Sequence, residues 1–315
     1  MTSTDWLSQL LSMVPVSGAL DYRCMLGTPW RIEHPSTRPG EIPFHAVVEG
    51  SAIVEVPGGG PPQRLVAGDI LLLPHGSQHI LRDGSKAEPA LVRARQTLSV
   101  TIKENDGPGA RFDMLCGRFI LSDMHERLVR TYFPLSLIVR APESAAASGS
   151  DTGQRVAGLV ALMRAESANE NLGGKAMLNA LTAALFAVTM RLAGEAGSAP
   201  EGLLALAGNP RLTPALTALF NEPAYPWTLP ELASRCNMSR ATFIRHFQER
   251  LGRSAADLLT DIRMTLAANM LRASDLSTGA VAEAVGYQSE AAFQRAFKSY
   301  MGVTPAQWRR DARNP

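Results

Sequence analysis

Near its C-terminal end the chain contains the same pattern of residues twice, at an offset of fifty positions. The first copy runs from Phe243 to Gly252 and the second from Phe293 to Gly302, and both read Phe-x-Arg-x-Phe-x4-Gly. Self-similarity at a fixed offset indicates a supersecondary unit that occurs more than once. The last third of the chain is therefore predicted to fold as two equivalent units.

The residues around each copy have the anatomy of a helix-turn-helix. A short helix with an alanine that permits close crossing precedes each copy, and a turn lies at Asn237 or Gly286, residues that tolerate a left-handed backbone. A capping box that begins at Thr228 marks a helix start. The pattern predicts two helix-turn-helix units, over about residues 228–250 and 277–300.

The second helix of each unit is suited to a DNA major groove. Its two phenylalanines lie four residues apart and point into the core, so the arginine between them, Arg245 or Arg295, projects from the opposite side. Arginine reads guanine with two hydrogen bonds, and small side chains allow the helix to approach. The alternative is a helical bundle with solvated basic residues, which the second copy of the pattern disfavours. The residues that we predict at the DNA are Ser239, Arg240, Ala241, Thr242 and Arg245 in the first unit, and Ser289, Glu290, Ala291, Gln294, Arg295 and Lys298 in the second.

The most specific stretch of the second unit runs from Val285 to Lys298 and continues from Gly302 through Pro305 to Trp308. Over about residues 210–311, the chain resembles the AraC/XylS transcription regulators. The resemblance implies that a long helix, at about residues 255–272, joins the two units and sets their recognition helices into successive major grooves. It places the base contacts on Ala241, Ile244, Arg245, Glu290, Ala291 and Arg295.

The chain departs from that family at two points. Asn237 stands where the family usually has glycine in the first turn, and asparagine also adopts that backbone conformation. Three of the six base-contacting positions hold alanine or isoleucine, so we expect hydrogen-bonded specificity to rest on Arg245 and Arg295. The expected partners are double-stranded promoter DNA, RNA polymerase and a second copy of the chain in a homodimer.

The charge of the chain is unevenly distributed. Residues 206–315 carry 13 Lys and Arg against 9 Asp and Glu, whereas residues 1–205 carry 18 against 20. The basic excess fits a domain that binds nucleic acid, although a solvated surface explains four charges almost as well.

Cysteine content and hydropathy bear on location. Three cysteines are too few for a disulfide framework, and we expect a cytoplasmic protein. The uncharged stretches Trp6–Leu20 and Ala176–Met190 fall short of the roughly 18–20 apolar residues that a membrane helix needs. Because no positive residue precedes the first stretch, a secretory signal is not expected either.

The N-terminal half has a different pattern of residues. Its first 120 residues are rich in proline and glycine and contain short apolar strands, which predicts an antiparallel barrel or jelly roll. The small polar run at 144–151 indicates a linker or loop. Apolar residues then recur at helical spacing from Val156 to Leu192, in helices that pack on the barrel or form a dimer seam.

The stretch from Gly68 to His79 fits Gly-x5-Pro-x-Gly-x2-His and resembles the second cupin motif, whose histidine is a ligand in metal cupins. The first cupin motif is not intact, because Pro43 occupies its glutamate position and no histidine pair precedes it. The competing hypothesis, a metal-dependent cupin enzyme with an accessory helical domain, lacks its ligand set. We therefore expect no enzymatic activity, no catalytic residue and no required cofactor.

Four side chains of the barrel are candidates for an effector site. Residues 5–190 resemble the cupin domain found at the N-terminus of some AraC-type regulators, on the basis of His45, Cys24 and Cys116 together with the second motif. Three roles stay open for Cys24, His45, His79 and Cys116: a tetrahedral zinc site, a thiol redox switch of the two cysteines, or the lining of a pocket for an organic ligand. Cys236 is predicted to face the helix-turn-helix core.

The predicted fold class is α+β with two domains: an N-terminal cupin-like β-barrel with flanking helices, and a C-terminal all-α double helix-turn-helix. The predicted boundaries are 1–140 for the barrel, 141–205 for a linker and helical dimerisation segment, and 206–315 for the DNA-binding domain. Such a chain is expected to be a one-component transcription regulator whose barrel responds to a small molecule or oxidant. A DNA-associated scaffold without a sensory role is the remaining alternative.

Overall fold

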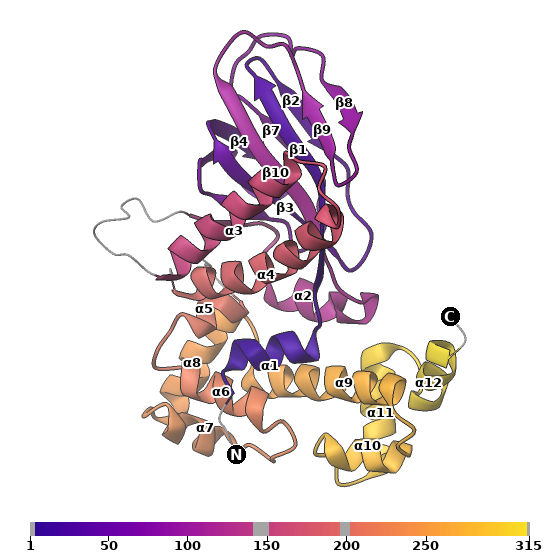
Figure 1. The fold of residues 1–315 in the computed structure, drawn as a ribbon. Helices are drawn as coiled ribbons and strands as arrows, with labels where there is room; N and C mark the ends of the chain where they lie inside the picture. The colour runs from indigo at the N-terminus through magenta and orange to yellow at the C-terminus, as the bar shows by residue number, and fades with distance from the viewer. Residues whose placement is uncertain (1–3, 141–150, 196–201, 314–315) are drawn as a thin grey trace. The chain divides into compact units, whose positions relative to one another are not determined.

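The computed structural model describes residues 4–140, 151–195 and 202–313, which divide into two compact units (Figure 1). One unit is Val16–Pro200, and the other combines Met1–Pro15 with Glu201–Pro315. The first contains all eleven strands of the described residues and the second is helical, which confirms the predicted α+β class. The predicted linker at 144–151 lies outside the described residues except for Asp151, where a helix begins.

Two sheets build the first unit. The larger has the strand order β11-β6-β3-β10-β1-β9-β8 and the smaller has the order β2-β7-β4-β5. All neighbouring strands pair antiparallel except β1 and β9, which run parallel. The strands are β1 (Ser17–Gly27), β2 (Arg31–His34), β3 (Glu41–Glu49), β4 (Ser51–Glu55), β5 (Gln63–Val66), β6 (Ile70–Leu72), β7 (His79–Arg82), β8 (Arg93–Gln96), β9 (Thr101–Glu104), β10 (Arg111–Ile120) and β11 (Leu137–Val139).

Both sheets contribute to one apolar core. Trp30 stacks on Phe112 with ring centroids 4.5 Å apart, and Leu81 of the smaller sheet is fully buried in the same cluster. At Gly117 of β10 a Cβ atom would fall 2.2 Å from the Ala19 carbonyl oxygen of β1. Glycine is therefore required where these two strands approach each other.

Helices cover the larger sheet of this unit. The helix α4 (Gly174–Glu195) packs on β1 and β10 and against α3 (Asp151–Ser167), while a 3-10 turn (Asp123–His125) leads into α2 (Glu126–Tyr132). Phe186 of α4 meets Phe119 of β10 edge-on, with ring centroids 4.9 Å apart. The helical spacing left two arrangements open, packing on the barrel or a dimer seam, and α4 packs on the barrel.

By length and composition, α4 could also cross a membrane, because the helix extends beyond the uncharged stretch to include Lys175 and Arg191. In the structure 44% of its most apolar window is buried inside the protein. The packing of α4 on the sheet accounts for its apolar composition, as it does for the core helices of soluble proteins.

The second unit contains the two predicted helix-turn-helix motifs. The first is α7 (Leu229–Arg235) with α8 (Arg240–Leu251), and the second is α10 (Thr278–Ala284) with α11 (Glu290–Met301). The predicted connecting helix is α9 (Ala255–Ala273). The remaining helices are α1 (Trp6–Met13), α5 (Leu203–Ala207), α6 (Thr213–Asn221) and α12 (Pro305–Arg313).

Local chemistry explains why the repeated pattern folds alike in both copies. Ser239 and Ser289 cap α8 and α11 through their side-chain oxygens, and each helix ends at a glycine in the left-handed conformation. In the turns, Asn237 has a φ of 51° and Gly286 a φ of 85°. A Cβ atom at Gly286 would fall 2.4 Å from the Ala224 carbonyl oxygen, so asparagine would not fit this second turn as it fits the first.

Two of the predicted domain boundaries need correction. The segment that contains α1 belongs to the helical unit rather than to the barrel, because its buried Leu7, Leu10 and Met13 pack with α6 and α9. Asn269 of α9 also donates a 2.7 Å hydrogen bond to the Met13 carbonyl oxygen. The helices α3 and α4, predicted as a separate segment, belong to the β-rich unit because α4 covers its sheet.

Truncation of a repeated phenylalanine is expected to destabilise the helical unit. Phe297 is fully buried between Phe293 and Trp308, so Phe297→Ala should lower the free energy of unfolding by about 3–5 kcal/mol. Thermal unfolding followed by circular dichroism measures the change, and Lys298→Ala, at an exposed position of the same helix, is the control. Equal unfolding temperatures for Phe297→Ala and the control would contradict the assigned core.

Candidate DNA-binding surface and barrel pocket

The two recognition helices present the predicted DNA-contacting side chains outward. Ten of these twelve residues are exposed, and Thr242 and Ile244 are half-buried. Arg245 lies on the face of α8 opposite the buried Phe243 and Phe247, and Arg295 has the equivalent place on α11. The structure thus leaves both arginines available to a ligand at equivalent positions of the two units.

Charged groups near these arginines are solvated. Glu249 approaches Arg245 at 3.9 Å one helical turn away, a separation at which an exposed ion pair contributes little and is readily exchanged for a phosphate or a base. On α11, Glu290 lies in the first turn and accepts a 2.9 Å hydrogen bond from Gln294. In the free protein, the negative charge of Glu290 stabilises the N-terminal end of the helix, and its carboxylate holds Gln294 in place.

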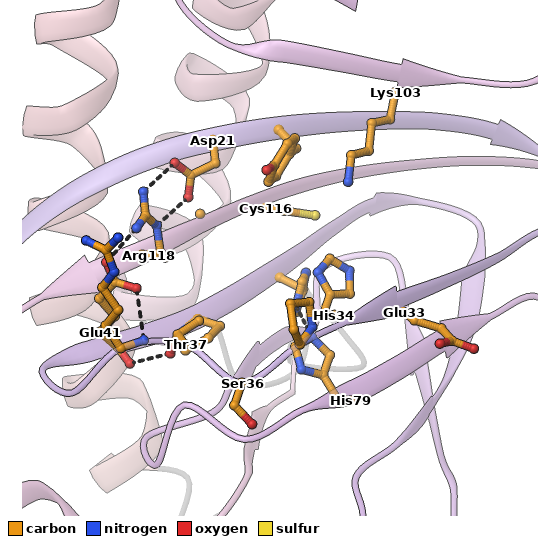
Figure 2. A pocket seen from close by; sticks show the side chains of 16 residues that line it. Asp21, Glu33, His34, Ser36, Thr37, Glu41, His79, Lys103, Cys116 and Arg118 are labelled. Atoms are coloured by element: carbon orange, nitrogen blue, oxygen red, sulfur yellow. Dashed lines mark hydrogen bonds and ion pairs between the residues drawn. The ribbon is translucent and has the colours of Figure 1, made fainter. Parts of the chain in front are cut away.

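A pocket of about 430 Å³ opens into the β-rich unit. It is lined from the larger sheet by Tyr22, Lys103 and Cys116 and from the smaller sheet by His34 and His79 (Figure 2). Its size is in the range of pockets that hold small organic ligands. Of the four predicted effector residues, three line this pocket (His45, His79 and Cys116), and Cys24 is buried in the core beside it.

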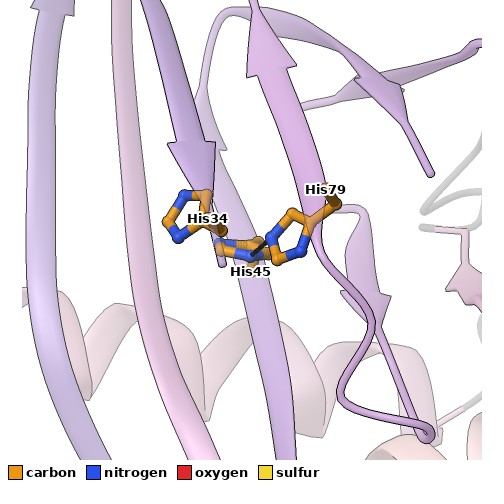
Figure 3. A group of neighbouring side chains, drawn as sticks. All are labelled: His34, His45 and His79. Carbon is orange, nitrogen blue, oxygen red and sulfur yellow. Dashed lines mark hydrogen bonds between the residues drawn. The ribbon is translucent and has the colours of Figure 1, made fainter. Parts of the chain in front are cut away.

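Three imidazole rings meet at one side of the pocket (Figure 3). The Nε2 atoms of His45 and His79 lie 2.7 Å apart, and the His34 ring stacks on His79 with ring centroids 4.6 Å apart. One ring nitrogen from each of the three residues lies within 4.8 Å of the other two. The predicted pair His45 and His79 is therefore in contact, and His34 joins it.

The histidines are neutral at physiological pH. Burial lowers the pKa of His34 to about 3, and burial together with the neighbouring histidines holds the pKa of His45 well below its ordinary value. Burial also lowers the pKa of His79, against a hydrogen bond to the Ser77 carbonyl oxygen that raises it. Because that carbonyl accepts the Nδ1 proton at 3.0 Å, the lone pair of neutral His79 lies on Nε2, which faces His45.

The two barrel cysteines form a separate pair. Their Sγ atoms lie 3.9 Å apart because Cys24 of β1 and Cys116 of β10 occupy diagonal positions of two paired strands. Both are free thiols, and burial raises the pKa of the Cys116 thiol. Among the described residues, the cluster of metal-ligand atoms within 4.8 Å contains neither sulfur, so the four predicted zinc ligands divide into a histidine group and a thiol pair.

Sequence reasoning missed His34 and Lys103. His34 ends β2 directly opposite His79 of β7, and this strand register is not visible in the sequence pattern. Lys103 of β9 places its ammonium group over the Tyr22 ring, 4.0 Å from the centroid. Cys236 is buried in the helical unit, as predicted.

Comparison with known proteins finds one domain type in each part of the chain, although the first match begins within the segment that contains α1. A family model described as Cupin matches residues 5–193, and a model described as Helix-turn-helix domain matches residues 232–311. An HTH-type transcriptional regulator of Haemophilus influenzae is 29% identical, and the alignment covers 97% of this chain and 98% of that protein.

Two further relatives have names that state a function. The RCS-specific HTH-type transcriptional activator RclR of Escherichia coli and the HTH-type transcriptional regulator MtrA of Neisseria gonorrhoeae are each 28% identical, with 98% of both chains covered. The cupin match spans more than half of the chain, and the helix-turn-helix match covers the repeated motifs. The chain therefore belongs to the AraC-type helix-turn-helix regulators with a cupin N-terminal domain, and it is a DNA-binding transcription regulator.

Proposed function

We propose that the protein is a one-component regulator that binds promoter DNA as a homodimer in the cytoplasm, contacts RNA polymerase there, and responds to a signal received in its barrel. The observation that carries the DNA-binding part is the equivalent placement of exposed Arg245 and Arg295 on two recognition helices. The competing proposal of a cupin enzyme finds less support, because Pro43 stands at the glutamate position of the first cupin motif.

Within this proposal the recognition residues have distinct roles. Arg245 and Arg295 read guanine through paired hydrogen bonds, since both side chains are exposed on their helices. Ala241 and Ala291, at the exposed N-terminal ends of the helices, allow the backbone to approach the base edges. Lys298, farther along α11, neutralises a phosphate without reading sequence.

The proposed signal is an oxidant that joins Cys24 to Cys116. A disulfide has an S–S distance of about 2.05 Å, so closure from 3.9 Å requires the sulfurs to approach by nearly 2 Å. A peroxide would accept two electrons and two protons from the thiols and leave as two waters, or as one water and one alcohol. The bond would link β1 and β10, which are already paired in the middle of the larger sheet, so closure would act on their side chains and local twist.

The proposed homodimer rests on the outer face of α3 and α4. Leu162 of α3 is 51% exposed and Met177 of α4 is 44% exposed, and the two helices pack against each other. Exposed apolar side chains on adjacent helices are typical of protein interfaces.

Loss of either arginine is expected to weaken specific DNA binding. Arg245→Ala and Arg295→Ala should each reduce the free energy of binding to the operator by about 1–3 kcal/mol and relax specificity at one base pair. Lys298→Ala should instead weaken binding to all DNA sequences alike. Genome-wide mapping of bound sites supplies the operator, and fluorescence anisotropy measures the affinities. Arg31→Ala, in the β-rich unit, is the control. Operator affinity equal to that of the wild type in both arginine variants would contradict the proposed contacts.

Oxidation is expected to change operator affinity through the thiol pair. Peroxide treatment of the wild-type protein should remove two hydrogens in a Cys24–Cys116 disulfide, detected by peptide mass spectrometry, and should shift the affinity for DNA. Cys24→Ser and Cys116→Ser should abolish both effects, while Cys236→Ser, in the helical unit, should retain them. A shift of the same size in Cys24→Ser would show that the response lies elsewhere.

Charge on the outer face of α3 and α4 is expected to separate the dimer. The double variant Leu162→Lys/Met177→Lys should elute as a monomer in size-exclusion chromatography with light scattering, at concentrations where the wild type is dimeric. Leu91→Lys, at a loop position that is 80% exposed, should leave the mass unchanged. A dimer in the double variant would move the interface to another surface.

A further inference from the structure

Three histidines from three strands meet at one point of the pocket. His34 at the end of β2 lies opposite His79 at the start of β7 in the smaller sheet, and His45 comes from β3 of the larger sheet. The sequence separates them, and the facing of the two sheets brings one nitrogen of each within 4.8 Å of the others (Figure 3). Three imidazole nitrogens at such distances have the donor type and the spacing of a transition-metal site.

The hydrogen bonds of the cluster are incomplete without a ligand. His34 Nε2 and His45 Nδ1 are buried and find no hydrogen-bond partner among the described residues. An unsatisfied buried polar atom destabilises the fold, so two such atoms in one cluster are unfavourable if the rings serve packing alone. A cation bound through His34 Nε2 would give that atom a partner that the protein itself does not supply.

The orientation of His79 fits metal ligation. Its Nδ1–H donates to the Ser77 carbonyl oxygen, which fixes the ring and directs the Nε2 lone pair toward His45. Histidine ligands commonly donate their other ring N–H to a backbone carbonyl in this way. Two ligands about 2.1 Å from a shared ion at the tetrahedral angle lie about 3.4 Å apart, so the two Nε2 atoms, now 2.7 Å apart, need to separate by about 0.7 Å.

The thiols are not needed to complete this site. Neither Cys24 nor Cys116 belongs to the cluster of mutually close ligand atoms, and the two sulfurs contact each other instead. The open side of the cluster faces the pocket, whose lining includes the ammonium group of Lys103. A divalent ion with three neutral ligands keeps its full charge, so the pocket then favours an anion at the open position.

We propose that His34, His45 and His79 bind one divalent transition-metal ion of the zinc class, with its open coordination position directed into the pocket beside Lys103. The site uses neither the recognition helices nor the two thiols as ligands. It differs from the zinc site expected from the sequence, which used two cysteines and omitted His34.

The first test measures zinc binding by the full-length protein. Titration with Zn²⁺ against a chromophoric chelator should give one ion per wild-type chain, and His34→Gln and His79→Gln should each weaken binding at least tenfold. His75→Gln changes a histidine of the same unit that bonds to the Phe133 carbonyl oxygen instead, and it should bind as the wild type does. The double variant Cys24→Ser/Cys116→Ser should also retain the ion. Zinc affinity that is unchanged in both histidine variants, or lost in the double cysteine variant, would overturn the proposal.

A second measurement needs no variant and therefore stands even if a histidine variant fails to fold. Wild-type protein loaded with Co²⁺ should show visible absorption of a low-coordinate ion with nitrogen ligands and no thiolate-to-cobalt charge-transfer band in the near ultraviolet. Addition of azide should shift the visible bands, because the open position accepts an anion. A thiolate band would assign the ion to the cysteines, and a spectrum identical to that of aqueous Co²⁺ would show that the histidines hold no metal.

Discussion

The pairing of β10 with β1 on one side and β3 on the other is the constraint on which the β-rich unit depends. Four residues of β10 each contact a different feature. Asp113 binds Arg23 and Arg164, Cys116 contacts Cys24, Gly117 leaves room for the β1 backbone, and Phe119 packs on α4. The Arg23–Asp113 pair is almost fully buried, with the closest N–O distance 2.8 Å. Because removal of one partner would leave a buried charge, this register is fixed strongly.

The two units treat polar groups in opposite ways. In the β-rich unit, ionisable side chains are withdrawn from water, which keeps the histidines neutral and the Cys116 thiol protonated. In the helical unit, the basic side chains of the recognition helices stay solvated, where they are free to meet phosphates and base edges. Burial thus leaves neutral imidazole and thiol groups at the pocket of one unit, and exposure leaves the basic side chains of the other unit accessible to DNA.

How far the sequence predicts each part depends on how local the interactions are. The helix-turn-helix units were predictable because their caps, turns and paired phenylalanines lie within a few residues of one another. The sequence did not place α1 in the helical unit, because the bond from Asn269 to the Met13 carbonyl joins residues 256 positions apart. The sequence did not identify His34 for the same reason, because its position opposite His79 depends on the register of two strands that are distant in sequence. The predicted thiols and histidines do lie near one another, but they form two separate groups. Cys24 contacts Cys116, whereas His45 contacts His79 and His34.

The membership of α1 in the helical unit has a consequence for the order in which the chain folds. The helix is synthesised before every strand of the β-rich unit, yet the α6 and α9 surfaces that bury Leu7 and Leu10 are made some two hundred residues later. The helical unit is therefore incomplete until the whole intervening unit has emerged from the ribosome. A fragment that begins at residue 202 keeps both recognition helices but bares the apolar surface that α1 covers. Such a fragment is expected to be less soluble than the chain from which it is cut.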